Sequence, residues 1–209
     1  MSAVTAAATA PPDRRRSPAP RRAGLPAGPR SEVVGSDCSY RRCRRLRMLG
    51  LSADELLTTT RAVRKRLDFD RPVDPGLMTE CLDIALQAPS GGNRQDWVWM
   101  VVADPAKKAA LAELYRQAWA AYRESPHFPT NERPREDPAV QASFERIADS
   151  AQYLSDNLER APLFLIPCLA ISRVERPSWG GAASRLGSVI QASWSFMLAA
   201  RERGLGTCW

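Results

Sequence analysis

Residues 88–103 read APSGGNRQDWVWMVVA, a polar turn with two adjacent glycines that leads into a run of large apolar residues. The run from Trp97 to Ala103 is rich in aromatic and β-branched residues, and Asp104-Pro105 closes it, which predicts a buried strand. The preceding turn predicts a loop, because glycines accept backbone conformations that other residues resist. We therefore expect a loop between a helix and a buried strand.

Two helices are expected before this loop. Asp74 followed by Pro75 is typical of a helix N-terminus, and apolar residues recur after it at helical spacing. Ser52, with Glu55 three residues later, predicts a capping box. The helix that begins there is expected to run to about Arg66.

Helical and strand patterns also alternate after the loop. Gly204 is expected to end the last helix in a left-handed conformation. A polar stretch with four prolines, residues 123–138, predicts a long loop. These patterns predict an α+β or α/β fold with a small central sheet. Helices are expected over 105–122, 140–158 and 180–203, and strands over 162–171 and from Leu205 onward.

The composition fits one folded domain. The 209 residues are 44% hydrophobic and 25% charged, which excludes a fibrous or wholly disordered chain. No run approaches the roughly 18 apolar residues that a membrane-spanning helix needs, and the N-terminus lacks the pattern of a secretory signal. We therefore expect a cytoplasmic protein without a membrane partner.

The formal net charge of +7 arises from the N-terminal part of the chain. Residues 1–47 contain eleven arginines and three acidic residues, whereas residues 48–209 are almost neutral. The first segment also has few large apolar residues, so we expect it to be disordered and residues 48–209 to form the folded domain. A basic interaction arm, a targeting segment and an upstream extension are the three interpretations of this segment.

The cysteines and the single histidine give little support for metal or nucleophilic chemistry. Five cysteines without paired ligand spacing favour free thiols over a disulfide framework or a zinc site. His127 lies in the proline-rich stretch, with no pattern of a nucleophile or an acid beside it. The sequence therefore predicts neither a metal site nor a catalytic side chain.

Two short segments carry polar groups suited to a cofactor. Residues 60–66 contain four cations, and guanidinium groups match phosphate oxygens, although a solvated basic helix face is the alternative. In the loop, glycines let the backbone approach a flat ring, and Asn93 and Gln95 can offer amide groups to the edge of a heterocycle. An ordinary loop is the alternative there.

Three motifs in this order resemble the FMN-dependent nitroreductase family of flavin oxidoreductases. Residues 61–64, RAVR, are similar to the family's Arg-Ser-Val-Arg motif, and residues 88–97 are similar to its Ala-Pro-Ser-x-x-Asn-x-Gln-Pro-Trp loop. Residues 198–207 resemble its helix that ends in Gly-Leu-Gly. The resemblance covers the chain from about Thr58 onward.

The resemblance implies an α+β, three-layer sandwich with a small central sheet, assembled as a homodimer with FMN at the interface. No catalytic side chain is implied, because the flavin itself carries the hydride chemistry. Eight residues are implied to bind the cofactor: Arg61, Ala62 and Arg64 at the phosphate and ribityl chain, Pro89, Ser90 and Gly91 against the isoalloxazine ring, and Asn93 and Gln95 in the same loop, with Asn93 at the ring edge.

The activity that the resemblance implies is the NAD(P)H-dependent reduction of nitroaromatic, quinone or similar electron-poor molecules by a ping-pong reaction. Two other interpretations stay open: an inactive, truncated flavoprotein remnant, and a nucleic-acid or acidic-surface binder through residues 1–47. Nucleic acid is the less favoured partner, because that segment has almost no aromatic residues to stack on bases.

Four departures from the family pattern stand out. Ala62 replaces the usual Ser, Asp96 replaces the usual Pro, and Trp194-Ser195 stands where many members have Gln-Asn. The family also continues past the Gly-Leu-Gly turn into a last strand, a second basic phosphate contact and an extension that wraps the partner subunit. We therefore expect a divergent member whose domain is incomplete at its C-terminus.

Overall fold

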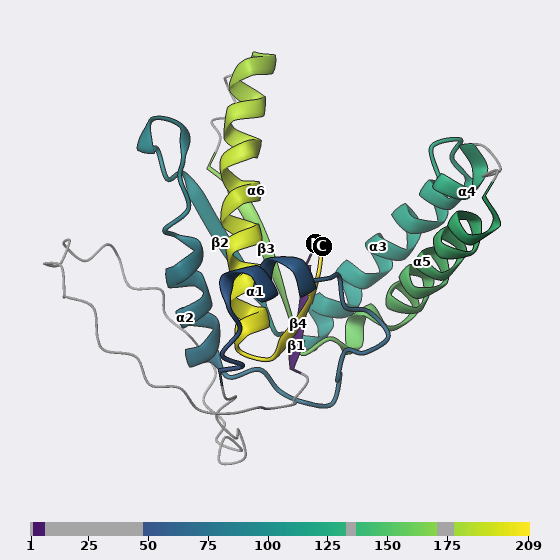
Figure 1. Ribbon diagram of the computed structural model, residues 1–209, viewed down its shortest axis with the longest axis horizontal. Helices are drawn as coiled ribbons and strands as arrows, with labels where there is room; N and C mark the ends of the chain where they lie inside the picture. Colours follow the sequence, from purple (N-terminus) through teal and green to yellow (C-terminus); the bar gives the residue numbers. More distant parts are fainter. Residues whose placement is uncertain (1, 7–47, 133–136, 171–177) are drawn as a thin grey trace, which may run out of the picture.

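The computed structural model describes residues 2–6, 48–132, 137–170 and 178–209 (Figure 1). A four-stranded sheet lies at its centre, and each pair of neighbouring strands is antiparallel. In the order β2-β3-β1-β4 across the sheet, the strands are Trp97–Val102, Leu163–Leu169, Ser2–Ala6 and Leu205–Cys208.

Helices cover this sheet unequally. Helices α2 and α6 pack against each other and lie on one face, while α3 and α5 meet the other face at one end and project away from it (Figure 1). This arrangement confirms the predicted α+β class. The helices are α1 Ala53–Thr59, α2 Pro75–Ala85, α3 Pro105–Glu124, α4 Pro129–Glu132, α5 Pro138–Asn157 and α6 Trp179–Glu202, with short 3-10 turns at Gly91–Asn93 and Leu158–Arg160.

Strand β3 divides the core into two parts, because successive side chains of a strand point to opposite faces. Leu163 and Leu165 belong to a cluster with α2 and α6 residues such as Cys81 and Phe196. Phe164, between them, belongs to the second cluster, with α5 residues such as Leu154. The sheet therefore separates two helical layers.

The predicted helix starts are confirmed. The Ser52 hydroxyl accepts from the Glu55 backbone N–H, and the Glu55 carboxylate accepts from the Ser52 N–H, so α1 begins with a complete capping box. Asp74 and Asp104 cap α2 and α3 with side-chain oxygens, each followed directly by proline. Gly204 ends α6 with a φ of 72°, the left-handed conformation expected for it.

The predicted length of α1 is wrong. The helix ends at Thr59, not near Arg66, so the cations that follow it do not lie on a helix face. The hydroxyls of Thr58, Thr59 and Thr60 each donate to the carbonyl four residues earlier. Threonines are β-branched, and their hydroxyls compete for backbone carbonyls, so they favour the end of a helix. The backbone bond from the Val63 N–H to the Thr207 carbonyl also holds the next segment outside the helix.

Three further features differ from the expectations. Strand β2 is only partly buried, since Val98 and Met100 are each about half exposed. The proline-rich stretch contains the short helix α4. Ser2–Ala6 form β1 although disorder is expected for the segment 1–47; residues 7–47 lie outside the described residues, so that expectation stays a prediction for them.

None of the helices in the described ranges is both long enough and apolar enough to cross a bilayer.

Candidate functional site

The segment after α1 is fixed to strand β4. The Val63 backbone N–H donates to the Thr207 carbonyl at 2.8 Å. A Cβ placed on Gly206 would lie 3.0 Å from the Leu67 side chain and 3.2 Å from that of Val63, so both side chains pack directly on the glycine. The structure therefore brings the first and third sequence motifs together, and Gly206 is required for their close approach.

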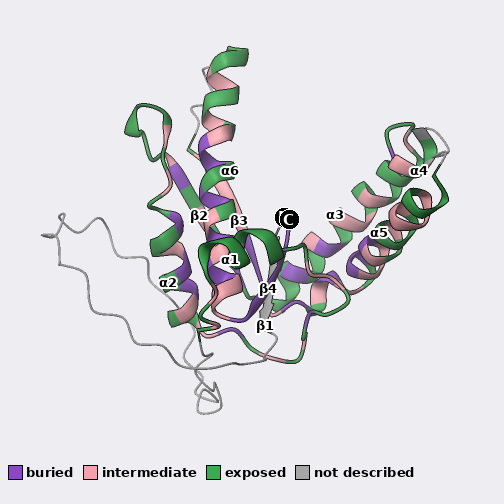
Figure 2. Ribbon diagram, in the orientation of Figure 1, coloured by how far each residue is buried: buried purple, intermediate pink, exposed green. Residues whose placement is uncertain are grey.

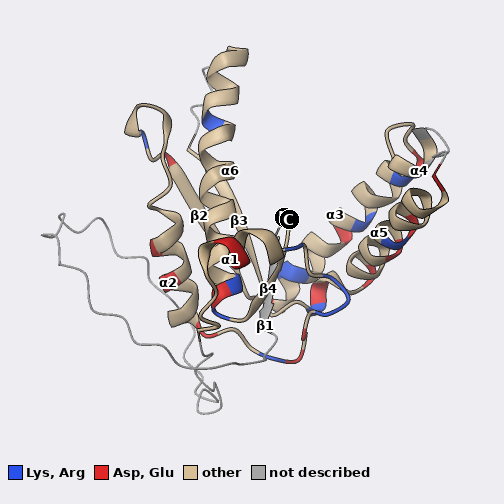
Figure 3. Ribbon diagram, viewed as in Figure 1, with Lys and Arg blue, Asp and Glu red and all other residues tan. Residues whose placement is uncertain are grey.

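Two guanidinium groups extend from this fixed segment. Arg61 is exposed and donates from Nη1 to the Thr60 carbonyl at 2.7 Å, while Arg64 is half-buried. Within the described part of the chain neither has a carboxylate partner, whereas the neighbouring Lys65 pairs with Asp149. Figure 3 shows this basic stretch beside α1. Two uncompensated guanidinium groups on a rigid segment suit an oxyanion such as phosphate.

Arg64 also lies beside the thiol of Cys208. Burial raises the pKa of this thiol, and the positive charge and hydrogen bond of Arg64 act in the opposite direction. Tyr115 of α3 is close to the same guanidinium, which acts to lower its pKa, although burial raises that pKa overall. Arg64 is thus held between β4 and α3, an environment that the sequence motif did not reveal.

The glycine loop before β2 has an unusual backbone. Gly92, Asn93 and Gln95 have φ values of 64°, 52° and 49°, in the left-handed region that non-glycine residues rarely adopt. The Gln95 N–H donates to the Ser90 hydroxyl at 3.2 Å, and its side-chain amide donates to Asn93 Oδ1 at 2.6 Å. Pro89 and the two amide residues are exposed, so the loop presents polar groups outward.

Helix α6 supports this loop from behind. The Gly91 N–H donates to the Ser188 hydroxyl at 3.2 Å, and a Cβ on Gly91 would lie only 2.6 Å from Ser184 Oγ. Ser184 and Ser188 lie one helical turn apart, and sequence reasoning missed both. Their spacing of four places both hydroxyls on one side of the helix, and this spacing is the signal that could have identified them.

The predicted site residues form two groups rather than one. Arg61, Ala62 and Arg64 lie after α1, whereas the loop lies at the start of β2, and Figure 1 shows helix α6 between the two positions. One copy therefore presents the cations and the glycine loop as separate surfaces.

Apolar side chains are exposed on α6 and β2, the two elements that adjoin the glycine loop. Leu186, Ile190 and Trp194 follow one another at a spacing of four along α6, and each is between about 39% and 53% exposed. Val98 and Met100 are exposed on β2. Figure 2 shows that the N-terminal part of α6 extends beyond the sheet and is largely exposed or half-buried. A contiguous stripe of this kind is typical of a protein interface.

The remaining candidates add no reactive group. His127 is exposed, and Ala62 is an exposed residue without a hydroxyl in the first group. In the regions that the structure describes, no three His, Cys, Asp or Glu side chains gather in a way that could hold a metal ion. Asp96 contributes its carbonyl, which accepts from the Ala170 N–H at 2.9 Å and so ties the loop to the end of β3.

Comparison with known families gives one match that spans most of the chain. The sequence profile of the nitroreductase family matches residues 57–209. A curated protein from Thermus thermophilus, named NADH dehydrogenase, is 55% identical over 42 residues. That alignment covers 20% of this chain and 20% of the relative, so the chain matches only about a fifth of the relative's length.

Two solved structures share the fold. Oxidized iodotyrosine deiodinase bound to FMN and 3-iodo-L-tyrosine is 21% identical, with a TM-score of 0.53 over 73% of this chain and 71% of the other. A BluB-like flavoprotein from Clostridium difficile 630 is 17% identical, with a TM-score of 0.50 over 77% of this chain and 74% of the other. At these identities the likeness concerns the fold alone.

Proposed function

Because the chain belongs to the nitroreductase family, we propose that it is an FMN-dependent oxidoreductase that uses NAD(P)H to reduce nitroaromatic compounds, quinones or similar electron-poor molecules. The fold-level neighbour that holds FMN supports the choice of cofactor. The Thermus relative named NADH dehydrogenase supports a nicotinamide as the electron donor. When bound, FMN would accept a hydride from the nicotinamide and pass its electrons to the second substrate.

The first group of residues fits the phosphate end of FMN. Arg61 and Arg64 supply guanidinium groups without carboxylate partners among the described residues, and the bond from Val63 to Thr207 keeps their backbone in place. Guanidinium groups bind phosphate oxygens in pairs, and a fixed segment loses less entropy on binding. Ala62 offers only its backbone, so the two arginines would supply most of the affinity for the phosphate.

The second group fits the ring of FMN. Pro89, Ser90 and Gly91 form a partly exposed surface with little side-chain bulk, and Ser188 holds the backbone behind it. Asn93 and Gln95 already share one hydrogen bond, so their remaining amide groups are oriented and available to the edge of a heterocycle. These residues would bind and orient the ring; none is proposed as an acid or a base.

We propose that a complete site needs two copies of the chain. The observation that carries this proposal is the position of helix α6 between the arginines and the glycine loop of one copy (Figure 1). In a homodimer formed through the apolar stripe of α6, the arginines of one copy would lie against the loop of the other. Burial of the stripe would also remove its apolar surface from water.

Mixed dimers test the shared site directly. Arg64→Ala and Asn93→Ala copies, each with a different affinity tag, are expected to bind FMN weakly when purified separately. After co-expression, the mixed dimer should recover one intact site of two, because one copy supplies Arg64 and the other supplies Asn93. Flavin content per dimer, from absorbance, is the measurement. No recovery in the mixed dimer would mean that each copy builds its own site.

The choice of substrates needs a separate measurement. The FMN-loaded wild-type protein should oxidise NADH or NADPH only slowly alone and much faster when a quinone such as menadione or a nitroaromatic compound is added. Parallel-line initial-rate plots are expected for a ping-pong reaction. A protein that binds no FMN in an absorbance titration would contradict the proposal at its first step.

A further inference from the structure

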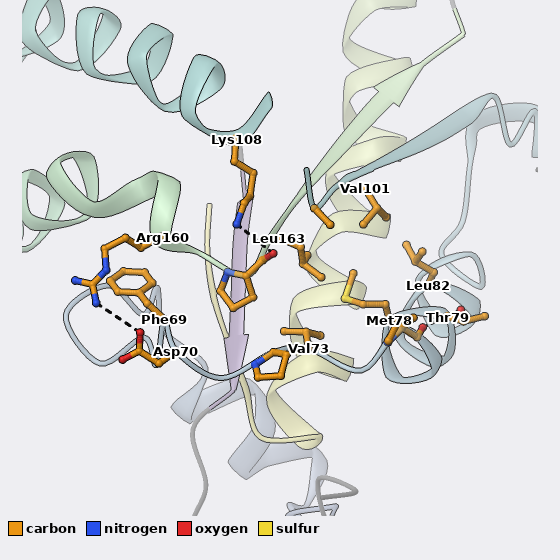
Figure 4. A pocket seen from close by; sticks show the side chains of 14 residues that line it. Phe69, Asp70, Val73, Met78, Thr79, Leu82, Val101, Lys108, Arg160 and Leu163 are labelled. Carbon is orange, nitrogen blue, oxygen red and sulfur yellow. Dashed lines mark hydrogen bonds and ion pairs between the residues drawn. The ribbon is translucent and has the colours of Figure 1, made fainter. Parts of the chain in front are cut away.

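A cavity of about 580 Å³ lies away from both groups of residues described above. Val101 and Ala103 line it at the end of β2 opposite to the glycine loop. Most of its wall is apolar, and Figure 4 shows the side chains of this part lying around Leu163. The apolar wall includes Val73, Met78, Leu82, Val101 and Leu163.

One buried cation lines this cavity. Lys108, in the first turns of α3, is only 8% exposed, and its ammonium group donates to the Ala161 carbonyl at 2.6 Å and to the Pro162 carbonyl at 3.4 Å. An ammonium group has three N–H donors, so one of them has no partner among the residues that the structure describes. Figure 4 shows the Lys108 side chain extending toward Leu163, with a dashed line from its amine to a carbonyl oxygen. Burial lowers the pKa of Lys108, as expected for an ammonium group without a carboxylate beside it.

The other charges on the wall are already matched to each other. Arg160 lies with its guanidinium 5.1 Å from the centre of the Phe69 ring, and its Nη2 is 3.8 Å from Asp70 Oδ1. The Asp70 side chain is 93% exposed and therefore points into solvent. The cavity consequently carries one net positive charge, at Lys108, beside an extended apolar surface.

We propose that this cavity binds a small amphipathic carboxylate, with the carboxylate at the Lys108 ammonium and the hydrocarbon part on the apolar wall. The volume lies within the roughly 300–1,000 Å³ that small-molecule pockets occupy. A carboxylate would satisfy the remaining N–H of Lys108 with a charge-assisted hydrogen bond. The site is separate from the proposed FMN site, so its occupation does not depend on the proposed activity.

Octanoate is a suitable probe, and two neighbouring lysines provide matched variants. Lys108→Met removes the buried charge and keeps most of the side-chain volume, whereas Lys107→Met removes an exposed charge one residue earlier. Calorimetric titration of the full chain should show that Lys108→Met weakens octanoate binding at least tenfold and that Lys107→Met changes it less than twofold. Octylammonium, which has the opposite charge, should bind wild type at least tenfold more weakly than octanoate.

A second variant keeps the test decisive if Lys108→Met does not fold. Thr79→Trp places a large ring at the exposed rim of the cavity, leaves Lys108 unchanged, and should abolish octanoate binding. Circular dichroism establishes that each variant is folded. The proposal is overturned if wild type shows no saturable binding of octanoate, if octylammonium binds equally well, or if the Lys107 variant loses as much affinity as the Lys108 variant.

Discussion

Gly206 is the residue at which the first and third sequence motifs meet. Any side chain there would overlap with the side chains of Val63 and Leu67. Both are constrained, because the Val63 backbone is bonded to Thr207 and Leu67 is only 6% exposed. We expect Gly206→Ala to lower the free energy of unfolding by about 1–3 kcal/mol, the usual cost of overpacking, and to weaken FMN binding by displacing Arg64. Urea denaturation and a flavin titration measure the two effects.

Gly180→Ala is the control for this substitution, since a Cβ there meets no atom within 4 Å. We expect it to leave stability unchanged or to raise it by up to about 1 kcal/mol, because alanine favours a helix more than glycine does. If Gly180→Ala lost as much stability as Gly206→Ala, the loss at Gly206 could not be assigned to its contacts with Val63 and Leu67.

Cys81 predicts how stability depends on alkaline pH. Burial raises its pKa from 9.0 to about 11, with smaller and opposed effects of Arg203 and Glu80. The folded state therefore disfavours the thiolate, so the contribution of this thiol to stability is complete below about pH 9 and decreases as the pH rises from about 9 towards 11. The stability difference between wild type and Cys81→Ala should decrease between about pH 8 and about pH 10.5 in urea unfolding. A constant difference would contradict the burial of the thiol.

At the scale of elements, helix α5 is unevenly packed. Leu154, near its C-terminal end, is 4% exposed and belongs to the core, whereas Ile147, two turns earlier, is 50% exposed. We expect Leu154→Ala to cost about 2–5 kcal/mol, because it leaves a cavity beside the sheet. In the monomeric chain, Ile147→Ala should lower the free energy of unfolding by less than about 1 kcal/mol. Urea denaturation of both variants provides the comparison. A large cost at Ile147 would show that another surface covers this half of α5.

Local sequence signals predicted the starts of elements well. Ser52, Asp74 and Asp104 act through side-chain bonds within three residues, so the sequence carries the whole interaction. The loop before β2 and the left-handed Gly204 were predictable for the same reason. The types and approximate bounds of β2, β3, α3 and α6 followed from apolar periodicity.

Long-range contacts decided what the sequence did not reveal. The end of α1 depends partly on the bond from Val63 to Thr207, which joins residues far apart in the chain. The apolar run of β2 predicted burial, yet Val98, Met100 and Val101 are about half exposed, because an apolar run does not tell whether the same chain or another one covers it. The cavity at Lys108 likewise arises from three segments that no local pattern connects.

At the scale of the whole molecule, the apolar stripe of α6 predicts the assembly. Ile190→Glu places a charge in the middle of this stripe and should convert the proposed homodimer into a monomer with little bound flavin. Gln191→Glu is a matched control, since it adds the same charge to the next residue, which is exposed and lies off the stripe. Size-exclusion chromatography with light scattering and flavin absorbance gives both readouts. A dimer that tolerates Ile190→Glu would place the interface elsewhere.

The position of β1 has a consequence for the order in which the sheet can be completed during translation. Ser2–Ala6 pair with Leu163–Leu169 on one side and with Leu205–Cys208 on the other. Strand β1 is therefore synthesised before both of its partners, and closing so long a loop carries an entropic cost. Until β3 emerges, β1 and β2 of the nascent chain have no neighbouring strand, and such unpaired edges are prone to aggregate and are surfaces that chaperones protect.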